Sequence, residues 1–427
     1  MRNGKAAEKL CILLKGMLII GFSVQIVLGL GWMFRNFIEI QQFGRPEGFL
    51  YPLLLKVFGK IPRLLYLLQL GLAGVAGYML LKPIGSAGRL RRIWYVLAFM
   101  TLPMAMQCHL ALLPYSFVSS LFLLELSCLR QATEFGNGLD LRALAAAGAC
   151  WVGLALLLPE YSWLGLVPLA LTVVVRPALL RGNLRRLALC VVLIAAFGGI
   201  VAGIGSLTKT AKGSERTFWF NMASRMSWPT VWLDSEGWSQ DLREIALDVC
   251  WEAGYAPDNM EKVLKPVIET AVGQEKAQEY YREIALHSWN GRKVRIVRQI
   301  CWDMLIYGAP QAVLQLQLTG VGYDSFSGRN YEIMFMSSPR LTKYYVSYSC
   351  WWFFCSMGLT VLLWVMRHVK EGFRFSFGKA AFPIAAIVSL GAVVLYYTMR
   401  GAGIADYKQT VAAAGMWSLI ALWGIGR

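Results

Sequence analysis

Two acidic residues, Glu39 and Glu47, stand eight positions apart in residues 34–63, the first stretch that separates apolar segments. Each has an arginine nearby in the sequence, Arg35 and Arg45 respectively. A carboxylate held in position can take a proton from a hydroxyl group. A surface ion pair with the neighbouring arginine would serve structure only. The two carboxylates are therefore candidates for proton-transfer chemistry, with the ion-pair alternative left open.

Arg225 lies in the run FNMASRMSWP, residues 220–229, shortly after an apolar segment that ends near residue 204. A guanidinium group is planar and binds phosphate oxygens through two parallel hydrogen bonds. Aromatic residues such as Trp228 collect at the lipid–water interface, where they can border an acyl chain. The composition favours a site for a lipid-linked phosphate, and an ordinary interfacial anchor would have the same composition.

A second basic group, residues 292–298, reads RKVRIVR and begins five residues after His287. On a helix, Arg292 and Arg295 are close enough in angle to act together, whereas Lys293 points elsewhere. This spacing makes Arg292 and Arg295 candidates for binding phosphate. A solvated helix face or a contact with lipid headgroups is the alternative.

Glu125 is an acidic residue inside an apolar segment, where an ionisable side chain is a functional candidate by default; helix pairing or snorkelling with Arg130 is the alternative. The three histidines lie far apart, and the nine cysteines include no CxxC pair. Both observations argue against a metal site. We therefore expect no cofactor, although a divalent ion could take the place of the arginines.

The elements that carry these residues are membrane helices. The chain has 427 residues, is 57% hydrophobic and has a mean hydropathy of +0.49. Apolar runs of about 18 residues or more indicate transmembrane helices; the first run is too long for a signal peptide and is expected to be retained. We predict an all-α polytopic protein with about ten spans, at 10–33, 64–81, 93–111, 113–129, 143–158, 162–175, 187–204, 347–366, 380–398 and 409–425.

Charge fixes the expected orientation. With a cytoplasmic N-terminus, 19 of the basic residues outside 205–346 fall in inner segments and seven in short outer loops, as the positive-inside rule requires. Residues 205–346 then form one large extracytoplasmic segment, in which 16 acidic residues balance 16 basic ones. The net charge of +17 therefore comes from the loops that flank the membrane and does not indicate a nucleic-acid partner.

Three regions follow: an N-terminal membrane domain (1–204), the extracytoplasmic segment (205–346) and C-terminal membrane helices (347–427). Apolar residues at helical spacing predict helices over 241–253, from Pro257 onward, and over 274–307 as one helix or as two broken near Asn290-Gly291. The short apolar run 49–58 is expected to lie along the membrane surface. No nucleotide-binding, zinc-protease or nucleophile-elbow motif occurs.

This layout resembles the GT-C class of integral-membrane glycosyltransferases, which use a polyprenyl-phosphate-linked sugar. The run PEGFLYPLL at 46–54 is similar to the acidic and then aromatic stretch of that class's first outer loop, and Arg176-Pro177 to its Arg-Pro at a cytoplasmic helix end. The resemblance implies transfer of a sugar to a lipid or glycan acceptor of the cell envelope. Glu47 or Glu39 would be the base, and Arg225 with Arg292 or Arg295 would bind the phosphate beside Trp228.

One difference from the class is that no aspartate precedes Asp140, whereas the class has one early in its first outer loop. Three alternatives therefore stay open. An O-antigen ligase or polymerase would use His287 and arginines of the large segment. A transporter would use interrupted helices and Glu125. A non-catalytic membrane subunit would need neither.

Overall fold

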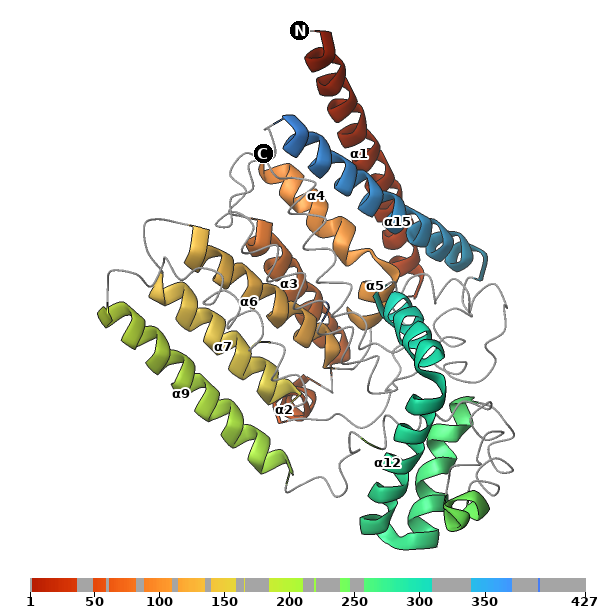
Figure 1. The fold of residues 1–427 in the computed structure, drawn as a ribbon. Coiled ribbons are helices and arrows are strands. Elements are labelled where there is room, and N and C mark those ends of the chain that lie inside the picture. The colour runs from red at the N-terminus through yellow and green to blue at the C-terminus, as the bar shows by residue number, and fades with distance from the viewer. Residues whose placement is uncertain are drawn as a thin grey trace.

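The computed structural model describes the protein mainly as long helices that pack into a bundle, with one helical element extending from it (Figure 1). The described residues are 2–36, 49–58, 61–81, 88–109, 114–134, 140–158, 165, 184–209, 219, 239–245, 257–308, 339–370 and 391. Within them the secondary structure is entirely helical, which confirms the all-α prediction for this part of the chain.

The helices follow one another in the order α1 (Arg2–Asn36), α2 (Leu50–Phe58), α3 (Pro62–Leu81), α4 (Arg89–Met100), α5 (Pro103–His109), α6 (Tyr115–Glu134), α7 (Leu141–Leu157), α9 (Leu184–Lys209), α12 (Pro257–Gly308) and α15 (Pro339–Lys370). Helix α6 packs between α3 and α7, and α9 covers the other side of α7 (Figure 1). Helix α1 packs against both α4 and α15, so the first helix of the chain contacts one more than 300 residues later.

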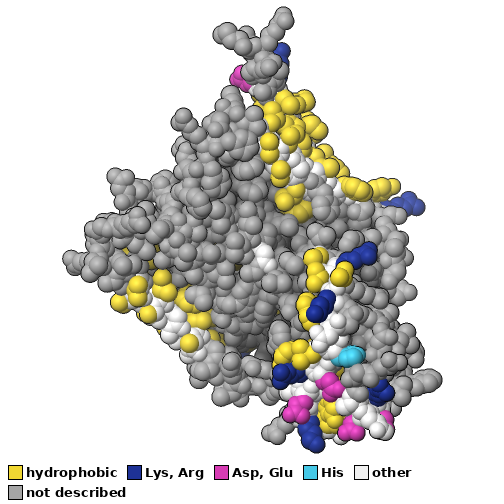
Figure 2. Space-filling view, viewed as in Figure 1, with side chains coloured by type: hydrophobic (Ala, Val, Ile, Leu, Met, Phe, Trp, Pro, Cys, Tyr) yellow, Lys and Arg dark blue, Asp and Glu magenta, His cyan; other side chains and the backbone are white. Residues whose placement is uncertain are grey.

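Within the described part of the chain, three helices are long and apolar enough to cross a membrane, namely Glu8–Phe34, Arg63–Leu81 and Tyr344–Leu363. Two shorter apolar helices are Leu141–Leu157 and Val191–Ile204. Apolar side chains also cover the outside of α1, where Val27 is 69% exposed and Ile12 65% (Figure 2). These features agree with a membrane location. The predicted spans 162–175, 380–398 and 409–425 lie outside the described residues, apart from two isolated positions.

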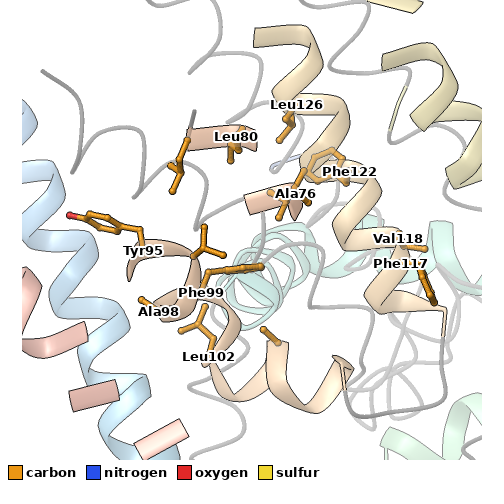
Figure 3. Close-up of a cluster of buried hydrophobic side chains, with 14 of the residues drawn as sticks. Ala76, Leu80, Tyr95, Ala98, Phe99, Leu102, Phe117, Val118, Phe122 and Leu126 are labelled. Carbon is orange, nitrogen blue, oxygen red and sulfur yellow. The ribbon is translucent and has the colours of Figure 1, made fainter. Parts of the chain in front are cut away.

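The core of the bundle is built from one face of each helix. Phe122 and Leu126 of α6 lie beside Ala76 and Leu80 of α3, and Phe117 and Val118 join the same cluster at the start of α6 (Figure 3). From the facing helices come Ala76, Leu80, Tyr95 and Phe99. A second apolar cluster on the other side of α6 joins it to α7 and α9. Helix α6 is thus enclosed on both sides, and it carries the polar residues described below.

The predicted span 93–111 is interrupted, because α4 ends at Met100 and α5 begins at Pro103. Proline lacks an N–H donor and disfavours a helical conformation in the preceding residue. The backbone carbonyls released there are bonded by distant helices: Gln25 Nε2 of α1 donates to the Ala98 oxygen at 2.8 Å. The Tyr345 hydroxyl of α15 donates to the Thr101 oxygen. The single helix predicted for 93–111 is therefore wrong at Pro103.

Helix α12 reverses direction at Gly273 and forms a hairpin, which extends away from the bundle in Figure 1. The φ of Gly273 is 79°, a left-handed conformation that a right-handed helix cannot continue through. Glu269 and Tyr281 would be about 18 Å apart along a straight helix. Burial and the Glu269 carboxylate nevertheless together raise the pKa of the Tyr281 phenol, so the two arms lie side by side. The break considered near Asn290-Gly291 is absent, because both residues are helical.

A short helix, residues 240–245, packs onto this hairpin. The Ser239 backbone N–H, which precedes the helix, donates to Glu283 Oε1 at 2.8 Å, and the Ser239 hydroxyl donates to Oε2 at 3.3 Å. Leu242, Ile268, Tyr281 and Ile284 are buried between these elements. The predicted helix 241–253 is confirmed at its start, and residues 246–253 lie outside the described part.

The bond between Tyr345 and the Thr101 carbonyl predicts a specific stability effect. Tyr345→Phe removes the donor and leaves a buried carbonyl without it, so the free energy of unfolding should fall by about 1–3 kcal/mol. Tyr344→Phe is the matched control, because Tyr344 is 70% exposed. Thermal unfolding of both variants in detergent measures the difference; equal midpoints would show that the bond contributes nothing.

Candidate functional site

Four of the residues singled out from the sequence, Glu39, Glu47, Arg225 and Trp228, lie outside the described part of the chain. Arg292 and Arg295 are on the second arm of α12, and only their helical backbone is described. That Glu47 or Glu39 lies close to these arginines therefore stays a prediction. What the structure does describe is the surface on which the first loop rests.

Helix α2 connects the first loop to one end of the bundle. The Phe49 backbone N–H, two residues after Glu47, donates to the Leu156 carbonyl near the end of α7 at 3.0 Å. Tyr51 is fully buried, and its ring meets that of Phe117 edge-on at 6.1 Å, near the start of α6. Leu53 and Val57 on the other side of α2 are 57% and 64% exposed. The run 49–58 is thus a helix with one docked face and one open apolar face.

Beneath α2 lies a buried polar cluster at the junction of α5 and α6. His109 Nδ1 is 2.7 Å from Ser116 Oγ, and both residues are fully buried. The Ser119 and Ser120 hydroxyls donate to the Ser116 carbonyl at 3.1 and 2.8 Å. Phe117, which contacts Tyr51, is the next residue after Ser116, so the cluster and α2 share this end of the bundle.

The second ring nitrogen of His109, Nε2, has no hydrogen-bond partner among the residues that the structure describes. A buried polar atom without a partner costs about 1–3 kcal/mol, so such an atom in a native protein calls for an explanation. An imidazole nitrogen can bind a hydroxyl, a phosphate oxygen or a water molecule as donor or acceptor, depending on its tautomer. His109 therefore offers a ligand-binding group directly below the anchored loop.

Sequence reasoning missed His109 because it weighed the three histidines together as metal ligands and singled out only His287, for the ligase alternative. A local signal was present: Ser116, Ser119 and Ser120 recur at helical spacing after Pro114, and they place hydroxyls on one face of an otherwise apolar helix. That His109 folds back onto this face depends on the connection between α5 and α6. The sequence periodicity does not determine this connection.

Glu125, the acidic residue in the apolar segment, is fully buried on α6, and neither carboxylate oxygen has a hydrogen-bond partner. It lies among residues of α6, α7 and the following segment: Cys128, Cys150, and Gly165, whose added Cβ would lie 2.9 Å from Glu125 Oε2. Arg130 instead donates to the Leu80 carbonyl of α3 at 3.2 Å. Five positions along a helix turn the two side chains about 140° apart, which explains why they do not pair.

Within the described residues, no group of three His, Cys, Asp or Glu side chains is placed to hold a metal ion. The two buried polar sites, at His109 and at Glu125, therefore differ in the chemical groups that they contain. At the junction of α5 and α6, the His109 imidazole is held by the Ser116 hydroxyl. In the interior, the Glu125 carboxylate lies near Cys128, Cys150 and Gly165.

Comparisons of the chain with protein-family models, curated proteins and solved structures gave no match. The resemblance to membrane glycosyltransferases therefore depends on the layout and the short runs quoted above. Any assignment of function must rest on the chemistry of this chain's own residues.

The bond between Ser116 and His109 can be tested by stability. Ser116→Ala leaves a second nitrogen of a buried imidazole without its partner, so the free energy of unfolding should fall by about 1–3 kcal/mol. Ser23→Ala is the control, because the Ser23 hydroxyl only bonds the Ile19 carbonyl within its own helix. Thermal unfolding in detergent compares the two; an equal effect would mean that His109 is held by other contacts.

Glu125 and Gln25 make a second matched pair. Both are fully buried, but Gln25 donates to Ala98 whereas Glu125 bonds nothing in the structure. Glu125→Met should leave thermal stability unchanged or raise it, since replacing an unsatisfied polar group by an apolar one of similar shape is neutral or favourable. Gln25→Met should lower it by about 0.5–1.5 kcal/mol. A loss in Glu125→Met as large as in Gln25→Met would reveal a stabilising partner of the carboxylate.

Proposed function

We propose that the protein is a membrane glycosyltransferase that transfers a sugar from a polyprenyl-phosphate donor to a lipid or glycan acceptor at the outer face of the cytoplasmic membrane. The observation that carries the proposal is the anchoring of α2 through Phe49 and Tyr51, immediately after Glu47 in the chain. A catalytic carboxylate in a loop needs such an anchor, because efficient catalysis requires a fixed geometry.

The proposed topology has about ten spans, a cytoplasmic N-terminus and residues 205–346 outside. It is supported by the contacts of α2 with α3 and α7, which bring the first loop to the end of the bundle where α1 ends and α3 begins. The open apolar face of α2, with Leu53 and Val57, suits a helix at the lipid–water interface. A lipid-linked donor would approach the site from that interface.

In the proposed reaction, Glu47, or else Glu39, takes the proton from the acceptor hydroxyl as its oxygen attacks the anomeric carbon of the donor sugar. The new glycosidic bond forms as the bond from that carbon to the phosphate oxygen breaks, and the lipid phosphate leaves with the electron pair. Arg225 with Arg292 or Arg295 stabilises the charge on the departing phosphate, and Trp228 borders the lipid chain. Direct attack inverts the anomeric configuration.

His109 has a supporting place in this scheme. Its ring is held by Ser116 below α2, and its free Nε2 can orient the first loop or the acceptor hydroxyl by a hydrogen bond. No step of the transfer needs a proton from His109. Its contribution would be one of position, by keeping the carboxylate and the acceptor within reach of each other.

A transporter is the second candidate, and two observations favour it. The α4–α5 helix is interrupted at Pro103, and Glu125 is a buried acid without a partner inside the bundle. Transporters build their sites from interrupted helices and intramembrane charge. Against this candidate, the freed carbonyls at the interruption are bonded by Gln25 and Tyr345, so they are not available to a substrate.

The deciding experiment replaces one carboxylate at a time. Glu47→Gln should lower the rate of sugar transfer from a polyprenyl-phosphate donor by about 100-fold or more, the typical contribution of a general base. The assay follows a labelled sugar in membrane vesicles, and thermal unfolding checks that the variant is folded. Full activity in Glu47→Gln, with loss in Glu39→Gln, would transfer the role to Glu39; full activity in both removes the proposal.

Glu125→Met separates the two candidates in the same assay. Sugar transfer should be unchanged, because the buried carboxylate takes no part in the proposed reaction. No sugar transfer by the unmodified protein, together with movement of a lipid or solute across the vesicle membrane that Glu125→Met loses while it stays folded, would favour transport.

A further inference from the structure

The second arm of α12 carries an exposed stripe of apolar and basic side chains. Leu286, Trp289, Lys293 and Val297 follow one another at intervals of three or four residues, which puts them on one face of the helix. Val294 and Arg298 lie along one edge of that face, on the side of Val297 and away from Trp289. All six are exposed; Val294 is 84% exposed and Val297 46%. We call these six residues the α12 stripe.

The stripe lies on the side of the second arm of α12 that is opposite the buried residues of that arm. Ala277, Tyr281, Ile284 and Ala285 are buried, and at 100° per residue they lie on the side of the helix axis opposite the stripe. The hairpin thus packs through these four buried residues and not through the stripe. Apolar side chains as exposed as Val294 are left without a role in the fold of this element.

Charge is distributed unevenly along the arm. The acidic residues Glu275, Glu279 and Glu283 come before the stripe, and residues 284–302 contain none. In Figure 2 the acidic side chains of this element lie near the turn of the hairpin, together with some basic ones, whereas the charged side chains farther along the arm are basic. In Figure 1 the end of α12 at Gly308 is the end drawn towards the bundle, and the turn lies farthest from it. The basic, apolar part is therefore closer to the bundle than the turn is.

We propose that the α12 stripe docks on the anionic phospholipid headgroups of the bilayer that holds the bundle. An amphipathic helix binds an interface through its apolar side chains, and basic residues add about 1 kcal/mol each near an anionic surface. Trp289 is of the type that gathers at the lipid–water interface. The surface binds the bilayer whether or not the protein transfers sugars, so it goes beyond the proposed function.

A second copy of the chain fits the stripe less well. In a two-fold dimer the same patch meets itself, so Lys293 and Arg298 would face their own counterparts with no acidic residue from 284–302 to offset them. Like charges brought together in this way oppose association. Phospholipid headgroups instead supply the opposite charge along the whole length of the stripe.

Cys301, which is exposed one helical turn beyond Val297, is a native reporter of docking. The full-length protein is placed in nanodiscs of zwitterionic lipid alone or with added phosphatidylglycerol. A water-soluble maleimide then modifies it, and mass spectrometry follows the rate at the peptide that contains Cys301. Docking should slow the modification in the anionic nanodiscs, and hydrogen exchange of residues 286–301 should slow with it, while exchange of the first arm of α12 should stay the same.

Matched variants show whether the charges of the stripe are responsible. Lys293→Gln and Arg298→Gln should each reduce the ratio of docked to free arm about fivefold, the equivalent of about 1 kcal/mol per cation. Lys276→Gln is the control, because Lys276 is exposed on the same arm but lies before the stripe. Equal rates in the two lipids, or equal effects of the three variants, would overturn the proposal. So would protection that appears only when two copies share a nanodisc, because it would assign the stripe to self-association.

Discussion

A single constraint governs the bundle: in a membrane, a backbone group that the helix does not bond must find its partner inside the protein. Pro103 breaks the helix between α4 and α5 and releases carbonyls at Ala98 and Thr101. Gln25 of α1 and Tyr345 of α15 donate to them. The interruption therefore joins the first helix to one more than 300 residues later. The α1–α15 contact also excludes larger residues, because the Trp352 ring lies 2.1 Å from where a Cβ on Gly21 would be.

Because buried polar groups need a hydrogen-bond partner inside the protein, the buried side chains that lack one are informative. Among the buried polar residues of α5 and α6, the Ser119 and Ser120 hydroxyls bond a backbone carbonyl of their own helix. His109 Nε2 and the Glu125 carboxylate have no such partner among the described residues. The first lies at the junction of α5 and α6, and the second lies farther along α6, near Cys128 and Cys150. A site for sugar transfer can use only the first, and a transport pathway would need the second, so the two residues separate the two functions.

Hydropathy was sufficient to predict where the long helices lie, since α1, α3, α6 and α15 overlap the segments predicted for them, with ends that differ by up to eight residues. It failed at Pro103, because the apolar run continues through the proline and hides the break. At α12 the Asn290-Gly291 pair drew attention as a turn signal, yet the reversal occurs at Gly273, where a left-handed conformation is needed. The His109–Ser116 contact could not be predicted from periodicity, because it depends on how two helices are joined.

The two sets of basic residues on α12 lie on different sides of the same helix. Positions 292 and 295 lie roughly opposite the stripe around the helix axis, given 100° per residue. If Lys293 and Arg298 hold the arm to the headgroups, the backbone at 292 and 295 is turned away from the bilayer plane. A phosphate bound there would be separated from the bulk phospholipid phosphates that the stripe binds. If the protein is a glycosyltransferase as proposed, this division would let it tell a lipid-linked donor from the surrounding lipid, which one continuous basic face could not do.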